Sequence, residues 1–558
     1  MFTTLLAPVR GTVASKMSVR QKVLVSKLRH GEMGWQEYAK QSVGALRGSG
    51  GREPALQTAE SIHISEEVRR DNLLRIRDAL AEAGAEFVEL PRRGLERSVL
   101  VVPRAGLRAA LRALRSLPGS SGWSLAFEDE RLQPIVEDHL AKKFDAVSRI
   151  ICRRRVCAPN GRVLSSRSEQ VVVEFWDDLG PRVPRVDGST HIPGTLHRRV
   201  RNPRIVVEYL TPEMWDDAAV GNDRRVEFAA PDIYTVREPV DVVYTWVDGS
   251  DVEWKKRQLA ARGMSDEDEL NATALSASRF TDRNELMYSL RSLESYASWV
   301  NHIYIVTDRQ VPEWLNTDHP KITVVDHRDI FSRPENLPVF NSHAIESQLH
   351  HIEGLSEQYL YLNDDLFFMR PTSPELFFTG SGLSKFFPST APLDLAEATA
   401  RDLPVLSAAK HGREFMLSRH GRTVTHKFKH TPHPQLKSVL AEFERREPEL
   451  FAAVSASTFR HPDDCSIASS LYHFHAYAQG RAVDAGIRYA YMDIARPDAA
   501  LYLRRLSRRN DLDVLCLNDT DFGNGNPEAV TSLLTGFLEE RFPFPSSFEK
   551  DEPANDPG

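Results

Sequence analysis

The sequence predicts an α/β protein with a central, mostly parallel sheet, a helical C-terminal part and a separate N-terminal α/β unit. Four apolar runs in the middle of the chain are of strand length and rich in Val, Ile and Tyr, which suit a buried pleated surface. Helix-like stretches separate these runs, and strands that alternate with helices form parallel sheets with helices on their faces. Each run leads into an acidic residue: Asp248, Asp308, Asp326 and the pair Asp364–Asp365.

The acidic ends of these runs predict a ligand site. In open α/β sheets, ligands bind outside the carboxyl ends of the strands. Several carboxylates would therefore gather on one rim, where like charges repel unless a cation or a proton joins them. This layout is typical of a site that binds a divalent metal and handles phosphate.

The chain has 558 residues, which is too many for one hydrophobic core and indicates two or three domains. We expect a basic helical segment over 1–57, an α/β accessory domain over 58–235, a catalytic domain over 236–548 and a disordered tail over 549–558. A formal charge of -7 argues against a nucleic-acid binder as a whole, since such domains carry a basic excess.

No apolar stretch approaches 18 residues and no charged region precedes the short apolar start, so neither a transmembrane helix nor a signal peptide is predicted. We therefore expect a cytoplasmic protein. Residues 1–50 hold eight Lys and Arg against two Glu, which favours either a contact with the inner face of the membrane or a plain solvated start. The four cysteines are too sparse for a disulfide framework and are expected to be buried thiols.

The N-terminal unit alternates helices and strands. An amphipathic helix is predicted from Ser65 to its stop at Gly84, with Leu73, Ile76 and Leu80 near one stripe. A strand over 97–103 and a second helix over 106–117 follow, and later strands are predicted over 170–176 and 203–210. No catalytic constellation stands out, so a regulatory or acceptor-binding module is predicted.

In the catalytic unit, a helix is predicted to start near Val252, and an acidic polar segment over 265–280 reads as a loop. Helices are predicted over 285–300 and 341–355. Residues 426–545 are predicted to be mostly helical, with disorder from Pro545 onward.

The residues that follow the strands carry the candidate chemistry. Asp364 and Asp365 at a strand end suit a metal site, against the alternative of a helix cap or turn. Asp248 and Gly249 follow the first strand, where open α/β sheets bind nucleotides, although the same pair is common in ordinary turns.

Two further segments supply groups for acid–base and phosphate chemistry. His430-Thr431-Pro432-His433 places two imidazoles around a rigid Pro, and such a loop is either structural or a source of a base. Arg460 suits bidentate phosphate binding, although surface arginines are common. The segment at Asn518 and Asp519 fails the calcium-loop spacing and is predicted to be a polar loop that faces the active site.

Five segments in order, DVVYTWVDGSD, RFTDRNELMYSLRSLE, NSHAIESQLHHIEGLSEQYLYLNDDLFF, HTPHPQLKSVL and CLNDTDFGNGNPEA, resemble the characteristic regions of the Stealth family. That family includes bacterial capsule and exopolysaccharide sugar-phosphate transferases and the catalytic subunit of the lysosomal-enzyme N-acetylglucosamine-1-phosphotransferase. The resemblance spans roughly 239–548. It implies a Rossmann-like or GT-A-like sheet.

The resemblance implies transfer of a sugar 1-phosphate from a nucleotide sugar, commonly a UDP-sugar, to a hydroxyl of an acceptor glycan, with Mg²⁺ or Mn²⁺. Carried onto this sequence, it assigns catalytic roles to Asp365, His430 and Arg460, and metal binding to Asp364, Asp365, Asn518 and Asp519. It assigns substrate binding to Asp241, Asp248, Arg279, Asp282, Glu285, Arg291, Glu346, His350 and Asn363. The lysosomal relative has Asn where Asp248 stands, which makes a metal role for Asp248 less secure than one for Asp365.

The chemistry expected from the resemblance is attack on the phosphorus next to the sugar, which retains the anomeric configuration and releases a nucleoside monophosphate. His430 is the expected base or transient phosphate carrier, with Asp365 as the alternative base. Two other functions stay open: a metal-dependent glycosyltransferase that releases the nucleoside diphosphate, and a glycan-binding module without activity. The sugar, the acceptor hydroxyl and the oligomeric state are not predicted.

Overall fold

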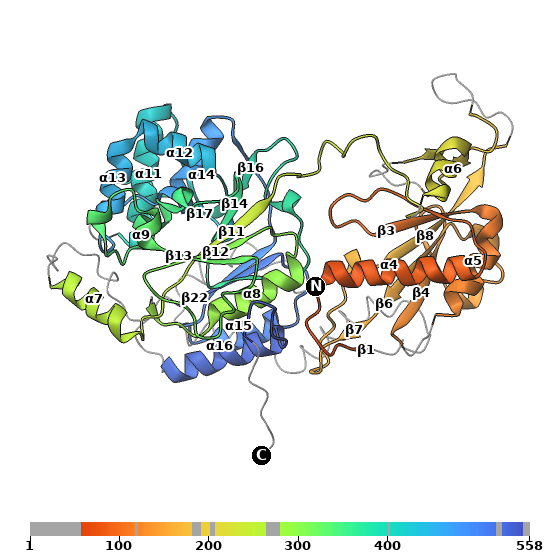
Figure 1. Ribbon diagram of the computed structural model, residues 1–558, viewed down its shortest axis with the longest axis horizontal. Helices are drawn as coiled ribbons and strands as arrows, with labels where there is room; N and C mark the ends of the chain where they lie inside the picture. The colour runs from red at the N-terminus through yellow and green to blue at the C-terminus, as the bar shows by residue number, and fades with distance from the viewer. Residues whose placement is uncertain are drawn as a thin grey trace, which may run out of the picture.

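The computed structural model describes residues 57–117, 121–180, 191–200, 207–221, 223–263, 280–399, 402–519 and 527–550. It contains two separate sheets, each with its own hydrophobic core. Figure 1 shows the N-terminal unit on the right and the C-terminal unit on the left. The residue limits predicted for the domains stay predictions, and the predicted segment 1–50 and Arg279 lie outside the described residues.

The N-terminal sheet has the strand order β10-β9-β8-β6-β4-β5, with β3 parallel to β8 and β2 paired with β3. Its strands are β2 (Val88–Glu89), β3 (Ser98–Pro103), β4 (Trp123–Glu128), β5 (Pro134–Ile135), β6 (Arg149–Arg154), β8 (Val171–Asp178), β9 (Leu196–His197) and β10 (Tyr209–Leu210), beside the short pair β1 (Gln57–Thr58) and β7 (Val156–Cys157). The helices are α4 (Ser65–Glu82), α5 (Leu107–Arg115) and α6 (Pro212–Val220).

Helices α4 and α5 cover one face of this sheet, and Figure 1 shows α4 lying across it. The predicted stripe of Leu73, Ile76 and Leu80 is buried there against Leu100 and Val173. The helices predicted from Ser65 and over 106–117 are therefore observed. Of the strand predicted over 203–210, residues 207–210 are described, and only Tyr209–Leu210 forms a strand, β10.

The C-terminal unit is built on a five-stranded sheet of order β13-β12-β11-β14-β19. Four neighbouring strands are parallel and β19 is antiparallel to β14. They are β11 (Val240–Thr245), β12 (Ile303–Thr307), β13 (Ile322–Asp326), β14 (Gln358–Asn363) and β19 (His433–Leu436). The four predicted apolar runs form the parallel strands, which confirms the predicted fold class.

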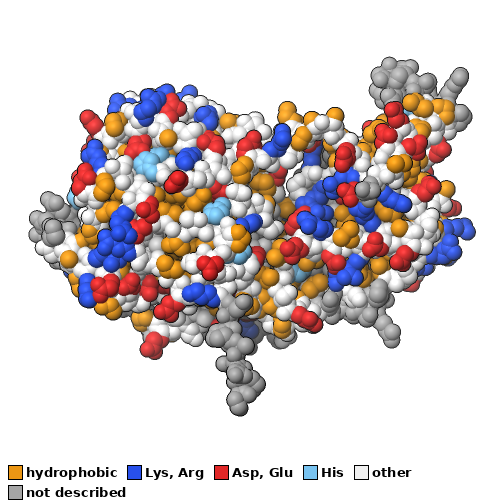
Figure 2. Space-filling model, in the orientation of Figure 1, with side chains coloured by type: hydrophobic (Ala, Val, Ile, Leu, Met, Phe, Trp, Pro, Cys, Tyr) orange, Lys and Arg blue, Asp and Glu red, His pale blue; other side chains and the backbone are white. Residues whose placement is uncertain are grey.

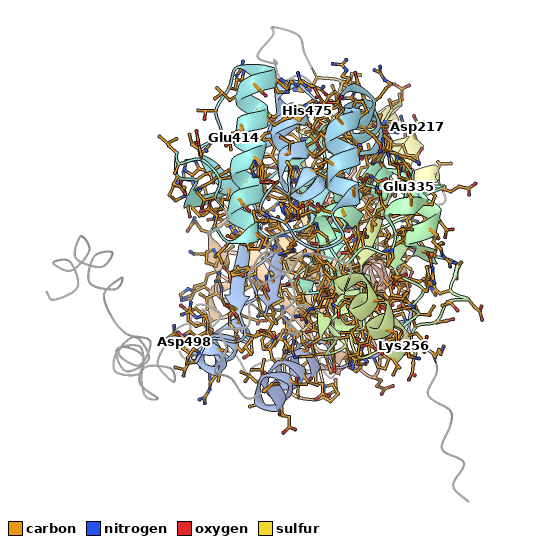
Figure 3. The ribbon with its side chains drawn as sticks, turned by 90° about the vertical axis from the view of Figure 1, so that its left-hand side faces the viewer. Asp217, Lys256, Glu335, Glu414, His475 and Asp498 are labelled. Atoms are coloured by element: carbon orange, nitrogen blue, oxygen red, sulfur yellow. The ribbon has the colours of Figure 1, made fainter. Side chains whose placement is uncertain are left out.

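Helices surround this sheet. They are α7 (Val252–Arg262), α8 (Glu285–Tyr296), α9 (His327–Ile330), α10 (Ser342–Glu346), α11 (Pro404–His420), α12 (Lys437–Arg446), α13 (Pro448–Ala456), α14 (Tyr472–Ala478), α15 (Ala499–Leu506) and α16 (Pro527–Arg541). Figure 3 shows α11 and α14, marked by Glu414 and His475, side by side at one end of the unit, with α7 and the start of α15, marked by Lys256 and Asp498, at the other.

The region 426–545 is less helical than predicted. It also contains β18 (His426–Phe428), β19, β20 (Ala482–Asp484), β21 (Tyr489–Asp493) and β22 (Val514–Asn518), which pair with β15 (Leu366–Phe368), β16 (Ser384–Phe386) and β17 (Pro388–Pro392) as well as with β14. The helix predicted over 341–355 is shorter, because α10 ends at Glu346 and only a 3-10 turn, Leu349–His351, follows.

Residues 545–550 are ordered, against the prediction of disorder from Pro545 onward, and the rest of the predicted tail, 551–558, lies outside the described residues. Phe548 is buried, and Glu549 forms a β-bridge with Leu315. Within the described residues, no helix is long and apolar enough to cross a bilayer. All four cysteines are free and buried, as expected. Figure 2 shows acidic and basic side chains interspersed over both units on the visible face, in line with the small net charge.

Candidate active site

The carboxyl ends of β11 and β14 lie side by side. The register pairs Thr245 with Asn363, so the residues that follow each strand leave the sheet at the same level. Asp364 and Asp365 then fill the short turn before β15. The amide of Leu517 in the neighbouring β22 segment donates to the Asp365 carbonyl at 3.1 Å, which fixes this turn. Two of the four acid-terminated strands therefore bring their following residues together at the rim, whereas Asp308 and Asp326, after the other two, form ion pairs with Arg257 and Arg328.

Carboxylates crowd on the β11 side of this rim. Burial, together with the charges of Glu285, Asp365 and Asp282, raises the pKa of Asp364 well above its usual value. Burial raises the pKa of Glu285 to about 7, with Asp282 adding to the rise and Arg283 opposing it. Burial and Asp248 raise the pKa of Asp282. The negative charge here exceeds what the neighbouring cations balance.

Such crowding fits a divalent cation. Mg²⁺ and Mn²⁺ prefer carboxylate oxygens, and Asp364 and Asp365 offer them at one turn. The Oδ1 atom of Asp365 is buried without a hydrogen-bond partner among the described residues, as expected for an oxygen that a cation would engage. Asp519 lies near the same group through Arg283, whose Nη2 donates to it at 2.7 Å. Asn518 ends β22 opposite Asp493.

His430 stands on the opposite side of Asp365. Its Nε2 lies 3.7 Å from Asp365 Oδ1 and 3.1 Å from Asn363 Nδ2. Burial lowers the pKa of His430, but the nearby negative charge of Asp365 outweighs this, and the net pKa is raised. A neutral ring can accept from Asn363 at Nε2, whereas a protonated ring faces the Asp365 carboxylate. This nitrogen is therefore placed to gain and lose a proton.

Cys516 is a third neighbour of Asp365 and was not predicted. Its Sγ donates to Asp365 Oδ2 at 3.4 Å, and the ligand atoms of Asp365, His430 and Cys516 lie within 4.8 Å of one another. The contact arises because Cys516 pairs with Leu366 across β15 and β22. Burial and the charge of Asp365 raise the pKa of this thiol well above its usual value, so it acts as a hydrogen-bond donor.

A cavity of about 170 Å³ opens on the β19 side of the rim. Glu346, Tyr361, Asn363, His430 and Arg460 line it. Its remaining wall includes serines, lysines and apolar side chains, namely Ser342, Ser466, Ser469, Ser470, Lys427, Lys429, Leu393, Val405, Val424, Phe428 and Phe474. Asn363 and His430 thus face both the cavity and the carboxylate group.

Arg460 is the strongest candidate for binding an anion in this cavity. Its Nη2 donates to Ser342 Oγ at 2.9 Å, and its Nε is buried without a partner among the described residues. The nearby Glu346 instead accepts from Ser466 and Ser469, each at 2.9 Å. Because serines satisfy this carboxylate, the guanidinium keeps donors for an oxyanion.

The loop after β11 is held in place by a close backbone contact. Gly249 N donates to Phe280 O at 2.6 Å, and a Cβ at position 249 would lie 2.3 Å from that oxygen. The amide and carbonyl of Asp248 both bond the Gln310 side chain, at 3.1 and 2.8 Å. Sequence reasoning missed Gln310, because a single Gln after the second strand carries no motif.

Three predicted substrate-binding residues make their contacts away from this rim, and their role in substrate binding stays a prediction. Asp241 stands near the start of β11 and accepts from Asn301 Nδ2 at 2.8 Å and Ser356 N at 2.7 Å. Arg291 on α8 binds Glu549, with Nη2–Oε2 at 2.6 Å. These residues hold chain segments together.

His350 is the third of these residues. Its Nε2 bonds Glu444 Oε2 at 2.7 Å, and His351 Nε2 bonds the same oxygen at 2.8 Å. Both histidines follow α10, and Glu444 belongs to α12, so this contact joins two peripheral segments. It does not line the cavity that holds His430.

The chain matches four regions that are conserved in Stealth proteins. Conserved region 1 matches residues 238–266, region 2 matches 279–386, region 3 matches 429–477 and region 4 matches 505–557. Residues from all four regions meet at the rim: Asp248 from the first, Asp364 from the second, His430 from the third and Asp519 from the fourth.

Two curated relatives match most of the chain. Exopolysaccharide phosphotransferase SCO6023 of Streptomyces coelicolor is 38% identical over 512 residues, which cover 87% of this chain and 83% of that protein. Exopolysaccharide phosphotransferase CpsY of Mycobacterium tuberculosis is 33% identical over 502 residues, which cover 88% of this chain and 90% of that protein. Alignments of this length also include much of the N-terminal unit.

Among solved structures, the galactosyltransferase LgtC in complex with donor and acceptor sugar analogs is 12% identical, with a TM-score of 0.28 over 53% of this chain and 95% of that one. The glycosyltransferase GlyE of Streptococcus pneumoniae is 13% identical, with a TM-score of 0.26 over 56% of this chain and 65% of that one.

Proposed function

Because this chain belongs to the Stealth family, we propose that it transfers a sugar 1-phosphate from a nucleotide sugar to a hydroxyl of an acceptor glycan, in exopolysaccharide or capsule synthesis. The proposed donor is a UDP-hexose or UDP-N-acetylhexosamine, and the nucleoside monophosphate is the leaving group. The names of both curated relatives support the phosphotransferase activity.

The observation that carries this proposal is the division of the rim into two halves by Asn363 and Asp365. A crowded carboxylate group lies on one side, and an imidazole and an arginine that forms no ion pair among the described residues lie on the other. A pyrophosphate that spans the two halves would meet a cation at one end and Arg460 at the other. An acceptor hydroxyl in the cavity would then meet His430.

In the proposed reaction, the acceptor oxygen forms a bond to the phosphorus next to the sugar. His430 Nε2 takes the hydroxyl proton, and the bond from that phosphorus to the oxygen of the nucleoside monophosphate breaks. The bond from the anomeric carbon to its oxygen stays intact. Asp365 stabilises the imidazolium that forms, and Arg460 donates to the phosphoryl oxygens, whose charge grows in the transition state.

A bound Mg²⁺ or Mn²⁺ would neutralise pyrophosphate charge, as in other phosphoryl transfers. Asp364 and Asp365 are the proposed ligands, and Asp519 is the proposed third, because Arg283 holds it beside Glu285. Cys516 fixes one Asp365 oxygen through its thiol, which leaves Oδ1 to face the cation or His430.

The products distinguish this reaction from a sugar transfer. The full chain is incubated with a panel of nucleotide sugars, Mg²⁺ or Mn²⁺ and short glycans, and the products are identified by mass spectrometry and 31P NMR. We expect a nucleoside monophosphate and a phosphodiester-linked glycan. Release of a nucleoside diphosphate with a glycoside product would instead identify a glycosyltransferase.

A further inference from the structure

The N-terminal sheet carries arginines on the face that α4 and α5 do not cover. Successive residues of a strand point to opposite faces. Ser98 pairs with Val171, and Val171 pairs with Cys152 on the covered face. Arg153, one position after Cys152, therefore lies on the opposite face, and Arg149 shares it because it is four residues from Arg153 on the same strand. Arg97 directly precedes β3, and continuing the same register places it beside Gln170 and Arg153.

Charge on this face is poorly balanced. Arg149 forms an ion pair with Glu128. Among the described residues, the side chain of Arg97 makes a single long hydrogen bond, 3.4 Å from Nη1 to Gln170 Oε1. The side chains of Arg153 and Arg167 form no hydrogen bond or ion pair with another described residue, and Arg153 Nε is buried without a partner.

The guanidinium groups repel one another as a result. Burial, together with the positive charges of Arg149, Arg167 and Arg153, lowers the pKa of Arg97 to about 10, although Glu128 opposes this shift. A group with this pKa is still charged at neutral pH. The cluster therefore keeps its positive charge in the absence of a ligand, and an anion bound among these side chains would relieve the repulsion.

We propose that Arg97, Arg153 and Arg167 form a binding site for a phosphate group, separate from the candidate active site. Phosphate suits this site because its oxygens accept parallel hydrogen bonds from planar guanidinium groups. Gln170 lies beside Arg97, and Ser124 pairs with Arg153 on the same face, which adds neutral donors.

The ligand that the reaction supplies is a phosphodiester in a saccharide chain, and this identification rests on the proposed function. Each transfer would leave a phosphodiester in the product. The arginine site would hold such a phosphate while the free end of the glycan reaches the rim. It would thus lower KM for acceptors that already carry a phosphodiester and leave neutral acceptors unaffected.

Phosphate binding is tested on the full chain by 31P NMR titration with inorganic phosphate and with glucose 1-phosphate at low salt. Arg153→Gln and Arg97→Gln are each expected to weaken binding at least tenfold. Arg112→Gln is the matched control, because Arg112 is an exposed arginine on α5, at the other face of the sheet. Equal binding by the wild type and Arg153→Gln would overturn the site.

Thermal stability and transfer activity are measured in separate experiments. Arg153→Gln removes a repelled charge, so its melting temperature without phosphate should equal or exceed that of the wild type, and phosphate should raise it less. In transfer assays, KM should rise about tenfold for a phosphodiester-bearing acceptor and stay unchanged for a neutral one. An unchanged KM for both acceptors would refute the saccharide as ligand. Absence of transfer by the wild type would refute the proposed function and leave the phosphate titration valid.

Discussion

His430 Nε2 lies 3.7 Å from Asp365 Oδ1, although the two residues flank different strands of the central sheet. Asp365 follows β14, and His430 precedes the antiparallel β19. The imidazole thus reaches the carboxylate from the cavity side. A carboxylate beside an imidazole stabilises the protonated ring, which is the form left after it has accepted a proton.

Replacement of His430 by Gln or of Asp365 by Asn should lower kcat/KM by roughly 10²–10⁴, because general base catalysis contributes about that much. The double variant should lose little more than the worse single variant, since the two groups act as a unit. His139→Ala, at an exposed histidine of the N-terminal unit, is the control. Full activity in both single variants would exclude this pair from the reaction.

Arg460→Ala should lower kcat by on the order of a hundredfold or more, about 3 kcal/mol, because it removes a donor aimed at developing phosphoryl charge. Arg460→Lys should recover only part of the loss, since Lys lacks the planar fork. Steady-state kinetics of both are compared with Arg422→Ala, an exposed arginine. Recovery of full activity by Lys would argue against bidentate phosphate binding.

Addition of Mn²⁺ should stabilise the wild type by about 2.7 kcal/mol at a hundredfold excess over Kd. Asp364→Asn should show a much smaller gain. In EDTA the variant should melt at the same temperature as the wild type or higher, because burial and neighbouring carboxylates already disfavour the Asp364 charge. Calorimetry with and without metal checks this, and an equal Mn²⁺ effect in both proteins would remove Asp364 from the metal site.

Arg291→Met and Glu549→Gln should each cost about 3–5 kcal/mol of unfolding free energy, because one partner of a largely buried ion pair is left alone. KM and kcat per folded molecule should not change, since the pair lies away from the rim. Urea unfolding and kinetics at low temperature separate the two effects. A raised KM with unaltered stability would support Arg291 as a substrate-binding residue.

The contact of Glu444 with His350 and His351 should make stability depend on pH. Burial opposes the charge on Glu444, but the two histidines outweigh burial and lower the pKa of Glu444 to about 2. The contribution of Glu444 to the free energy of unfolding is therefore complete above about pH 4.5 and is lost as the pH falls toward 2. Burial also opposes protonation of His351, but Glu444 and the carbonyl of Ile330 outweigh burial and raise the pKa of His351. The contribution of His351 to the free energy of unfolding is therefore complete below pH 6.5, the ordinary pKa of histidine, and is lost as the pH rises through the raised pKa.

His350 and Lys437 act in the opposite direction. Burial lowers the pKa of His350, and Lys437 disfavours positive charge on both rings. The stability lost in Glu444→Gln should therefore be largest between about pH 4.5 and 6.5, at roughly 1.5–3 kcal/mol for a hydrogen bond to a charged group. Urea unfolding of both proteins across this range measures it. A difference that does not vary with pH would show that the imidazolium contributes nothing.

The parallel strands were predictable because each is an apolar run, rich in residues that favour strands, followed by an acidic residue. The apolar run predicts the strand, and the acidic residue marks the end of the strand where a ligand is expected to bind. Asp241 shows the limit of the motif. It belongs to the same strand as the rim but stands at the other end, where it satisfies Ser356 and Asn301. A motif match does not tell which end of a strand a residue occupies, whereas strand direction does.

Cys516 and Gln310 were not predictable from the sequence. Cys516 reaches Asp365 only because β22 pairs with β15, two segments far apart in the chain whose pairing no local pattern encodes. The serines that satisfy Glu346 sit at or beside a π-helical turn, Ile467–Leu471, within what reads as an ordinary helix. Partnerships of this kind depend on tertiary pairing rather than on periodicity.

The reversed direction of β19 has a consequence for engineering. Because His430 arrives at the rim before its strand begins, the excursion from β15 to β19 forms one wall of the cavity without contributing the acidic turn. If the segment between β15 and β19 is exchanged between two homologues, the chimera should accept the glycan of the protein that supplied the segment. It should still use the nucleotide sugar of the protein that received it. Specificity for the acceptor glycan and specificity for the nucleotide sugar would then depend on different parts of one enzyme.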